Sequence, residues 1–181
     1  MTTGQQLTAM IERRLDIGFI RSPKKPATAP SVKVLHLVED PLVVVLPPGH
    51  PLGKQKAPIS ISVLAGEPFV MHPREIGTGV YDQVIELCQR AGFMPHVAQE
   101  ARETPTIVGL VATGLGVGIV PASLRSVKVK GVRYRPLEEK EARSSMWLVL
   151  RADRSSPQEA MFAALAQKHS IRSLKVGVVE A

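Results

Sequence analysis

The chain has 181 residues, a hydrophobic content of 44% and a formal net charge of +7. This length accommodates one substantial domain or two small lobes with a buried core. No apolar run approaches the length of a membrane span, and the first six residues lack the basic region and apolar core of a secretion signal. The single cysteine, Cys88, cannot form an internal disulfide, which fits a reducing cytoplasm.

The positive charge does not by itself indicate a nucleic-acid-binding surface. The excess is spread along the chain, with +2 in residues 1–40, +3 in residues 41–143 and +2 in residues 144–181. In the one local concentration, Lys128, Lys130, Arg133 and Arg135 are interleaved with apolar residues, which predicts the solvent-exposed face of a strand. Four Phe, two Tyr and one Trp are too few for a platform that stacks single-stranded bases.

Helical and extended patterns alternate in the first third of the chain. They predict, in order, a helix over 4–14, a strand over 15–20, a loop over 21–31, and two strands over 32–38 and 42–46 that residues 39–41 separate. The next segments predict a helical turn over 61–65, a strand over 68–72, a helix over 80–91 and a strand over 96–100.

The segment that follows contains strong local signals. Thr104 is predicted to cap a helix with Pro105 at its first position, where the missing N–H costs nothing. Gly114 suits the left-handed residue that ends this helix, and residues 117–120 form a short apolar strand. Strands over 132–136 and 146–151 follow, and Ser156 to Glu159 is a capping box that starts the last helix. Such alternation of strands and helices predicts parallel sheets covered on both faces.

Four segments carry a resemblance to a known family: 6–21 (QLTAMIERRLDIGFIR), 42–52 (LVVVLPPGHPL), 88–95 (CQRAGFMP) and 100–123 (EARETPTIVGLVATGLGVGIVPAS). In their order and spacing they resemble the C-terminal effector-binding domain of the LysR-type bacterial transcriptional regulators. The resemblance covers nearly the whole chain, from about Thr3 to about Ala160.

The resemblance implies an α/β fold of two Rossmann-like lobes, of the type II periplasmic-binding-protein kind. Lobe I would comprise residues 1–40 plus 144–181, lobe II residues 41–143, and an effector would bind in the cleft between them. Family members also carry an N-terminal winged helix-turn-helix, a linker helix, and a first strand and helix of lobe I. Because this chain begins at what resembles the second helix of lobe I, we expect lobe I to be incomplete and no DNA-binding domain to be present.

The predicted effector contacts lie where helices begin or a strand ends. Helix N-termini attract anions, and the arginine fork matches a carboxylate. The resemblance places the loop Gly77–Gly79 opposite the effector and a threonine at the first helix start. The predicted effector-binding residues are Thr3, Gly4, Arg21, Thr78, Gly79, Val80, Thr104 and Thr106.

Each of these predictions has an alternative. Thr3 is equally suited to be an ordinary helix cap at the chain terminus. Arg21 is also placed to form a surface ion pair with Asp16 or Glu39. The Gly77–Gly79 segment is nearly as well explained as an ordinary flexible loop.

The sequence argues against catalysis and against cofactors. The glycines at 114, 116 and 118 follow a helix, whereas a dinucleotide fingerprint needs a strand before them. The five histidines show no metal-ligand spacing, Ser123 lies outside a nucleophile elbow, and Cys88 suits the inner face of a helix. We therefore expect no enzymatic activity, no cofactor and no metal.

The leading hypothesis is a ligand-sensing regulatory domain that binds a small effector, an organic acid or other anion. The protein would be a cytoplasmic homo-oligomer without membrane contact and would reach DNA only through the N-terminal domain. One alternative is a stand-alone solute-binding protein of the same fold. Another is a truncated chain that acts by association with other regulators, and a third, without a catalytic constellation to support it, is an α/β enzyme.

Overall fold

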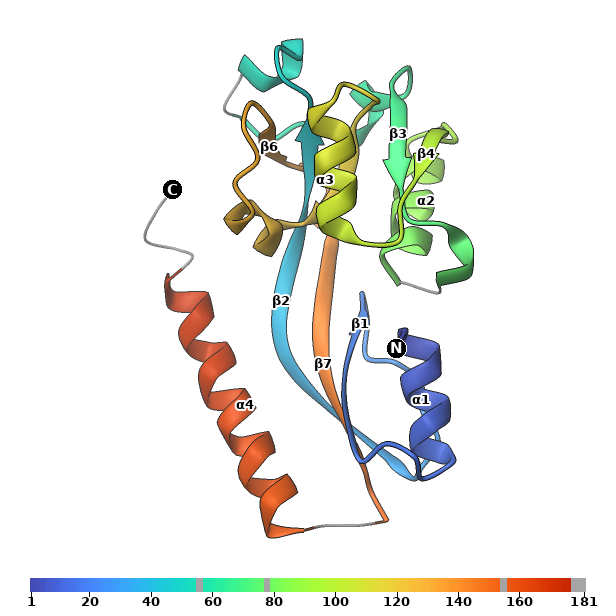
Figure 1. Ribbon diagram of the computed structural model, residues 1–181, viewed down its shortest axis with the longest axis vertical. Coiled ribbons are helices and arrows are strands. Elements are labelled where there is room, and N and C mark those ends of the chain that lie inside the picture. The colour runs from blue at the N-terminus through green and yellow to red at the C-terminus, as the bar shows by residue number, and fades with distance from the viewer. Residues whose placement is uncertain (55–56, 77–78, 154–155, 177–181) are drawn as a thin grey trace. The chain divides into compact units, whose positions relative to one another are not determined.

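The computed structural model describes residues 1–54, 57–76, 79–153 and 156–176. Its contacts divide the chain into two compact units, Met1–Glu39 with Ser145–Ala181 (unit 1) and Asp40–Ser144 (unit 2). Two strands run from one unit into the other: β2 (Val32–Leu46) and β7 (Arg143–Arg151) (Figure 1).

Unit 1 is a small antiparallel sheet with a helix on each face. Its strand order is β1-β7-β2, with β1 spanning Ile17–Ser22. Helix α1 (Thr3–Ile11) covers one face, where Met10 packs with Ile20 and Val149. Helix α4 (Pro157–Val176) covers the other, where its Ala163 and Ala166 pack with Leu148 and Leu150. Successive residues of β7 thus point to opposite helices, as the period of a strand requires.

The sheet of unit 2 mixes antiparallel and parallel pairs. Strand β2 pairs antiparallel with β5 (Gly118–Pro121) and with β6 (Arg133–Pro136). Strands β3 (Pro68–Met71) and β4 (His96–Glu100) pair in parallel. Residues of β3 also bond to Val117, just before β5: the Val70 N–H donates to the Val117 carbonyl, and the Val117 N–H to the Pro68 carbonyl, both at 2.8 Å.

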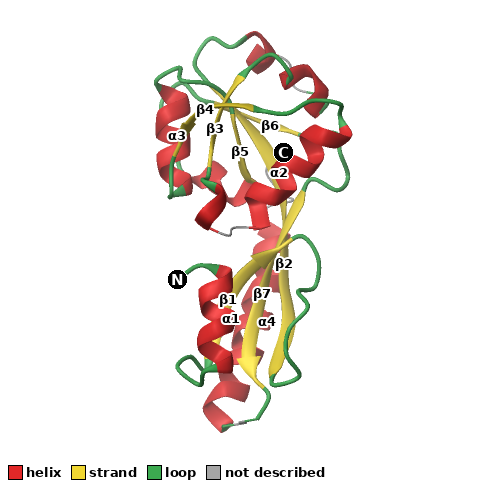
Figure 2. Cartoon of the chain, turned by 90° about the vertical axis from the view of Figure 1, so that its right-hand side faces the viewer, coloured by secondary structure: helices red, strands yellow, loops and turns green. Residues whose placement is uncertain are grey.

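Helices α2 (Gly79–Arg90) and α3 (Thr104–Ala112) cover opposite faces of this sheet (Figure 2). Val84 and Leu87 of α2 pack in one hydrophobic cluster, and Ile107 and Val111 of α3 pack in the other. Short 3-10 helices complete the unit at Pro51–Lys54, Ile61–Leu64, Arg74–Ile76 and Ala122–Ser126.

Strand β2 supplies side chains to the core on both faces of both units. In unit 1, Val32 belongs to the cluster under α1 and Leu37 to the cluster under α4. In unit 2, Leu42, Val44 and Leu46 face the α2 side, and Val43 and Val45 face the α3 side. Its burial on both faces explains why residues 42–46 read as an unbroken apolar run in the sequence.

Two local predictions are confirmed, at Gly114 and at the Ser156–Glu159 capping box. Gly114 has φ +86°, as expected for a left-handed residue after α3. At the start of α4, the Glu159 N–H donates to Ser156 Oγ and the Ser156 N–H donates to Glu159 Oε2, which forms the predicted capping box. None of the described helices is both long and apolar enough to cross a bilayer.

The predicted separation of two strands at residues 39–41 is wrong. β2 continues through Pro41, and the neighbouring Leu42 N–H donates to the Ala142 carbonyl at 2.8 Å. A proline interrupts a strand only where its own N–H would be needed in the ladder. The expectation of parallel sheets also holds only in part, because β1–β7, β2–β5 and β2–β6 are antiparallel.

The prediction of a solvent-exposed strand face at 128–135 holds only in part, because Lys128, Lys130 and Arg133 are exposed but Arg135 is buried. Only Arg133–Pro136 forms a strand, and Arg135 is 4% exposed. Its guanidinium donates to the carbonyl oxygens of Leu52 and Ala57, which fixes both ends of a loop beside β6. Alternation of charged and apolar residues did not reveal this role because a buried arginine with carbonyl partners has the same sequence pattern as an exposed one.

Helix α2 is tied to the start of β7 by side chains. Gln83, which is buried, donates from Nε2 to the carbonyls of Glu141, at 2.9 Å, and Arg143. At the end of the helix, Arg90 forms an ion pair with Glu141 at 3.2 Å. The buried amide matters more than the exposed ion pair, since an exposed pair contributes little to stability.

Two glycine substitutions test the packing of unit 2. Gly116 has φ +153°, and a Cβ added there would overlap the Pro68 carbonyl in the β3 pairing. We expect Gly116→Ala to lower the free energy of unfolding by about 2 kcal/mol or more. Gly109→Ala, inside α3 with no atom within 4 Å of the added Cβ, should raise it by about 0.5–1 kcal/mol. Urea unfolding measures both, and equal effects would contradict this account.

Candidate functional site

The first helix begins one residue earlier than predicted. Its N-cap is Thr2, whose Oγ1 accepts from the Gln5 N–H at 3.2 Å, while the Thr2 N–H donates to Gln5 Oε1 at 2.9 Å. Thr3 and Gly4 are therefore the first two helical residues and not the cap. A Cβ built on Gly4 would meet no atom within 4 Å, so the space beside the start of the helix is open.

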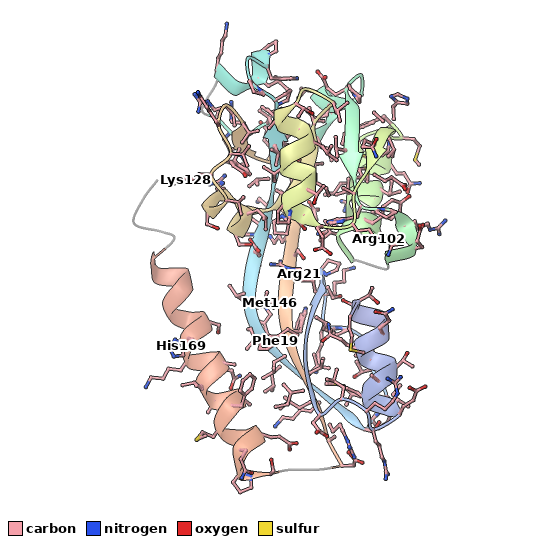
Figure 3. All side chains as sticks on the ribbon, in the orientation of Figure 1. Phe19, Arg21, Arg102, Lys128, Met146 and His169 are labelled. Atoms are coloured by element: carbon pink, nitrogen blue, oxygen red, sulfur yellow. The ribbon has the colours of Figure 1, made fainter. Side chains whose placement is uncertain are left out.

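Arg21 lies next to this helix start. It occupies the C-terminal part of β1, opposite Met146 of β7 (Figure 3). The Thr3 hydroxyl donates to the Arg21 carbonyl at 3.5 Å, a long hydrogen bond that places both residues together. Unit 1 thus brings the backbones of three predicted residues together, those of Thr3, Gly4 and Arg21. Ile20 packs under α1, so the side chain of Arg21 alternates to the opposite face of β1, the face of Met146.

Trp147 is close to the same end of β1. Its Nε1–H donates to the Ser22 carbonyl at 3.0 Å, and its ring contacts His36 edge-on with centroids 4.9 Å apart. As the single tryptophan of the chain, it offers an optical probe of this part of unit 1.

The predicted residues at the start of α2 divide into two groups. Gly77 and Thr78 lie outside the described residues. Gly79 is the first helical residue, and the Val80 side chain is buried in the cluster under α2. The Val80 side chain therefore supports the core, and the backbone of Gly79 and Val80 is the part that could contact a ligand.

The start of α3 also differs from the prediction. The N-cap is Glu103, which makes no side-chain capping bond, and Thr104 and Pro105 are the first helical residues. The Thr106 N–H donates to the Glu103 carbonyl at 3.0 Å, and the Thr106 side chain is exposed. The predicted cap failed because the Thr104 hydroxyl is engaged elsewhere.

The partner of Thr104 is His72, a residue that the sequence analysis treated only as one of five scattered histidines. Its Nε2 lies 3.2 Å from Thr104 Oγ1, and its Nδ1 lies 3.1 Å from the Ala101 carbonyl oxygen. Burial lowers the pKa of His72 and outweighs the Ala101 and Arg102 carbonyls and the Glu103 charge, which raise it. Its position directly after β3 was the signal that could have identified it, since polar residues at strand ends often line sites.

A second buried polar contact lies at the start of the unit 2 part of β2. The carboxylate of Asp40 accepts from the Ser123 N–H at 3.0 Å and from the Ser123 hydroxyl at 2.7 Å. These bonds fix the segment after β5, which gives Ser123 a structural role.

The described residues include concave surfaces of about 450 Å³ in each unit. One lies between α4 and the strands of unit 1, lined by Lys33, Arg151 and Glu159 among others. Another lies along β6 in unit 2 and includes Arg125 and Arg133. The predicted effector residues do not line either of them.

The described part of the chain offers no group of three or more His, Cys, Asp or Glu side chains that could hold a metal ion. Cys88 is buried in the cluster under α2, and burial raises the pKa of its thiol to about 12. A thiol with this pKa is protonated at neutral pH and is a poor nucleophile.

Comparison with known proteins identifies the family. Residues 1–170 match the LysR substrate binding domain, which is nearly the whole chain. The chain belongs to the LysR substrate binding domain family. The curved, mixed sheets and the two crossing strands agree with the two-lobed fold of this family.

Two relatives of this LysR domain are bacterial regulators. The uncharacterized HTH-type transcriptional regulator YnfL of Escherichia coli K12 is 38% identical over 149 residues, 82% of this chain and 49% of the relative. The HTH-type transcriptional regulator CatR of Pseudomonas putida is 38% identical over 157 residues, 87% of this chain and 53% of the relative. The chain therefore spans about half the length of these curated relatives.

A solved structure gives the same result for the fold. The effector binding domain of BenM, determined with its effector benzoate, superposes on the LysR domain with a TM-score of 0.79 at 26% identity. The match covers 100% of this chain and 79% of that chain. A curated BenM sequence from Acinetobacter baylyi is 29% identical over 152 residues, 83% of this chain and 49% of the relative.

The environment of Cys88 gives a test of the α2 packing. At about pH 8 we expect the native thiol to react with a disulfide reagent at least about a hundredfold more slowly than in urea, because burial both protonates and shields it. Absorbance of the released thiolate measures the rate. Rapid reaction of the native protein would show that α2 does not bury Cys88.

Proposed function

We propose that the chain is the ligand-sensing domain of a LysR-type transcriptional regulator and that it binds a small organic anion. Units 1 and 2 correspond to the two lobes of the family fold, and unit 1 supplies the groups that would bind the anion. The observation that carries this proposal is the grouping of Arg21, Thr3 and Gly4 at the start of α1, in a chain whose relatives are transcriptional regulators.

The chemistry of this grouping suits a carboxylate. The guanidinium of Arg21 supplies donors in a fixed fork, and the first turn of α1 adds the positive end of the helix dipole. Thr3 holds the Arg21 backbone in place, and the absence of a side chain at Gly4 lets a ligand approach the helix. The benzoate bound to the BenM domain is a carboxylate of this kind.

Binding transmits a signal only if the ligand has different affinities for two arrangements of the domain. In the full-length regulator, the ligand would shift that balance, and a DNA-binding domain of a homo-oligomer would respond. This role requires no catalysis and no cofactor, and it places the protein in the cytoplasm, where DNA-binding regulators act.

A stand-alone solute-binding protein of the same fold would bind the same ligands, so ligand binding does not separate the two functions. The matched relatives favour the regulator, because both are named HTH-type transcriptional regulators. If the chain instead acts by association with other regulators, we expect it to self-associate without ligand, and sedimentation measures this directly.

A carboxylate screen tests the proposal. We expect benzoate or another aromatic or aliphatic carboxylate to raise the melting temperature. At a ligand concentration a hundredfold above Kd, binding should increase the free energy of unfolding by about 2.7 kcal/mol. The fluorescence of Trp147 should change with the same Kd, because its indole is bonded to Ser22 beside Arg21.

Arg21→Ala should raise the Kd of the stabilising carboxylate about tenfold or more, since a hydrogen-bonded ion pair between Arg21 and the ligand is lost. Arg14→Ala is the matched control, because Arg14 is an exposed arginine of unit 1 that pairs with Glu12. The proposal is refuted if no carboxylate stabilises the protein, or if both variants change the Kd equally.

A further inference from the structure

The concave surface along β6 in unit 2, with a volume of about 450 Å³, carries charge of one sign. The described residues that line it include Arg125, Arg133 and Arg135 and no acidic residue. Arg125 and Arg133 are exposed, so their guanidinium groups are accessible to a ligand. We call this concavity, whose lining also includes Gly53 and Tyr134, the β6 surface.

Arg135 contributes a positive charge that no carboxylate neutralises. It is 4% exposed, its guanidinium donates to the carbonyl oxygens of Leu52 and Ala57, and its Nε has no hydrogen-bond partner among the described residues. None of the ion pairs within the described ranges involves Arg125, Arg133 or Arg135. A buried charge without a counter-charge is costly, and it strengthens the binding of an anion at the adjoining surface.

The part of the lining formed by Gly53 positions Arg133. The Leu52 N–H donates to His50 Nδ1 at 3.2 Å, and the Leu52 carbonyl accepts from Arg135, so the backbone next to Gly53 is held by two side chains. A Cβ built on Gly53 would lie 3.3 Å from Arg133 Cγ. The glycine backbone therefore lies against the aliphatic part of Arg133 and limits where its guanidinium can go.

The part of the lining that carries Arg125 is also tied to β6. Arg125 lies in the 3-10 helix Ala122–Ser126, and the Tyr134 hydroxyl donates to the Val127 carbonyl directly after this helix, at 3.0 Å. Both exposed arginines thus extend from segments that are ordered before a ligand binds. Such a surface loses little conformational entropy on binding.

The chemistry of the β6 surface suits an anion with more than one negative charge. A guanidinium presents its donors in a planar fork that matches the oxygens of a phosphate group. Two exposed forks and one buried charge exceed what a single carboxylate neutralises, whereas a phosphate monoester carries a charge of about −1.5 to −2 at neutral pH.

Nucleic acid shares this phosphate chemistry, and Lys128 and Lys130 extend the positive potential along the segment before β6. Two features favour a small ligand. The arginines converge on one concavity, whereas a duplex is followed by a basic stripe. The remaining excess of positive charge is spread along the chain and not gathered around this surface.

We propose that the β6 surface binds a phosphate-bearing small molecule and that Arg125 and Arg133 contact its phosphate groups. Arg135 adds its buried charge to the same surface. This site does not depend on the proposed function, because Thr3, Gly4 and Arg21 are not among the residues that line it.

Calorimetric titration of the full chain with sodium orthophosphate and sodium pyrophosphate tests the proposal. At neutral pH and constant ionic strength we expect pyrophosphate to bind about tenfold more tightly, because its second phosphate meets the second arginine. Added sodium chloride should raise both Kd values, since Arg125 and Arg133 are exposed and salt screens them.

Variants assign the binding to the two exposed arginines. Arg125→Ala and Arg133→Ala should each raise the Kd of pyrophosphate about tenfold, since each removes a hydrogen-bonded ion pair. Arg133→Lys keeps the charge but loses the fork, so it should raise the Kd only about threefold. Neither arginine belongs to a hydrophobic cluster, so we expect these variants to fold.

Arg102→Ala is the matched control. It removes the same charge from another exposed arginine of unit 2, on the opposite side of that unit from Lys128 (Figure 3). The Kd of pyrophosphate should not change in this variant. The proposal is wrong if neither phosphate binds, or if Arg102→Ala weakens binding as much as Arg133→Ala does.

Two further titrations separate the β6 surface from other functions. A short DNA duplex that binds more tightly than pyrophosphate, and loses binding in Arg125→Ala and Arg133→Ala, would overturn the proposal because the surface would then serve nucleic acid. Benzoate binding should be the same in all of these variants. If pyrophosphate fails to bind while a carboxylate still does, only the β6 site is refuted and the sensor function stands.

Discussion

The register of strand β2 is the constraint on which both units depend. Its fifteen residues contribute to the hydrophobic clusters on both faces of each unit. Because successive side chains point to opposite faces, a shift of one residue would exchange the layers under α2 and α3 and, at the same time, those under α1 and α4. Leu42 fixes the register in unit 2 through its bond to Ala142, and Val32 is part of the core in unit 1.

Local sequence signals identified the elements well, but not how strands pair. Gly114 and the Ser156–Glu159 capping box act within a few residues, so their conformations could be predicted from the sequence. Pro41 was misinterpreted because its effect depends on whether a distant strand needs its N–H. The antiparallel pairing of β2 with β5 likewise depends on the direction in which β2 enters unit 2, which no local pattern contains.

The candidate site shows the same division between local and distant information. Arg21 and Thr3 were predicted from a strand end and a helix start, and they do lie together. The role of His72 could not be predicted, because its ring meets Thr104 only after β3, β4 and α3 have assembled. The engagement of the Thr104 hydroxyl also explains why Glu103, with a weaker capping side chain, occupies the N-cap position of α3.

The attachment of Gln83 to the segment before β7 has a mechanical consequence. The buried side-chain amide of Gln83 donates to two carbonyls two residues apart, those of Glu141 and Arg143. Helix α2 and the first residues of β7 therefore move as one body unless both bonds break together. A rotation of α2 that kept both bonds would therefore also displace the backbone at Glu141 and Arg143, directly before unit 2 ends at Ser144.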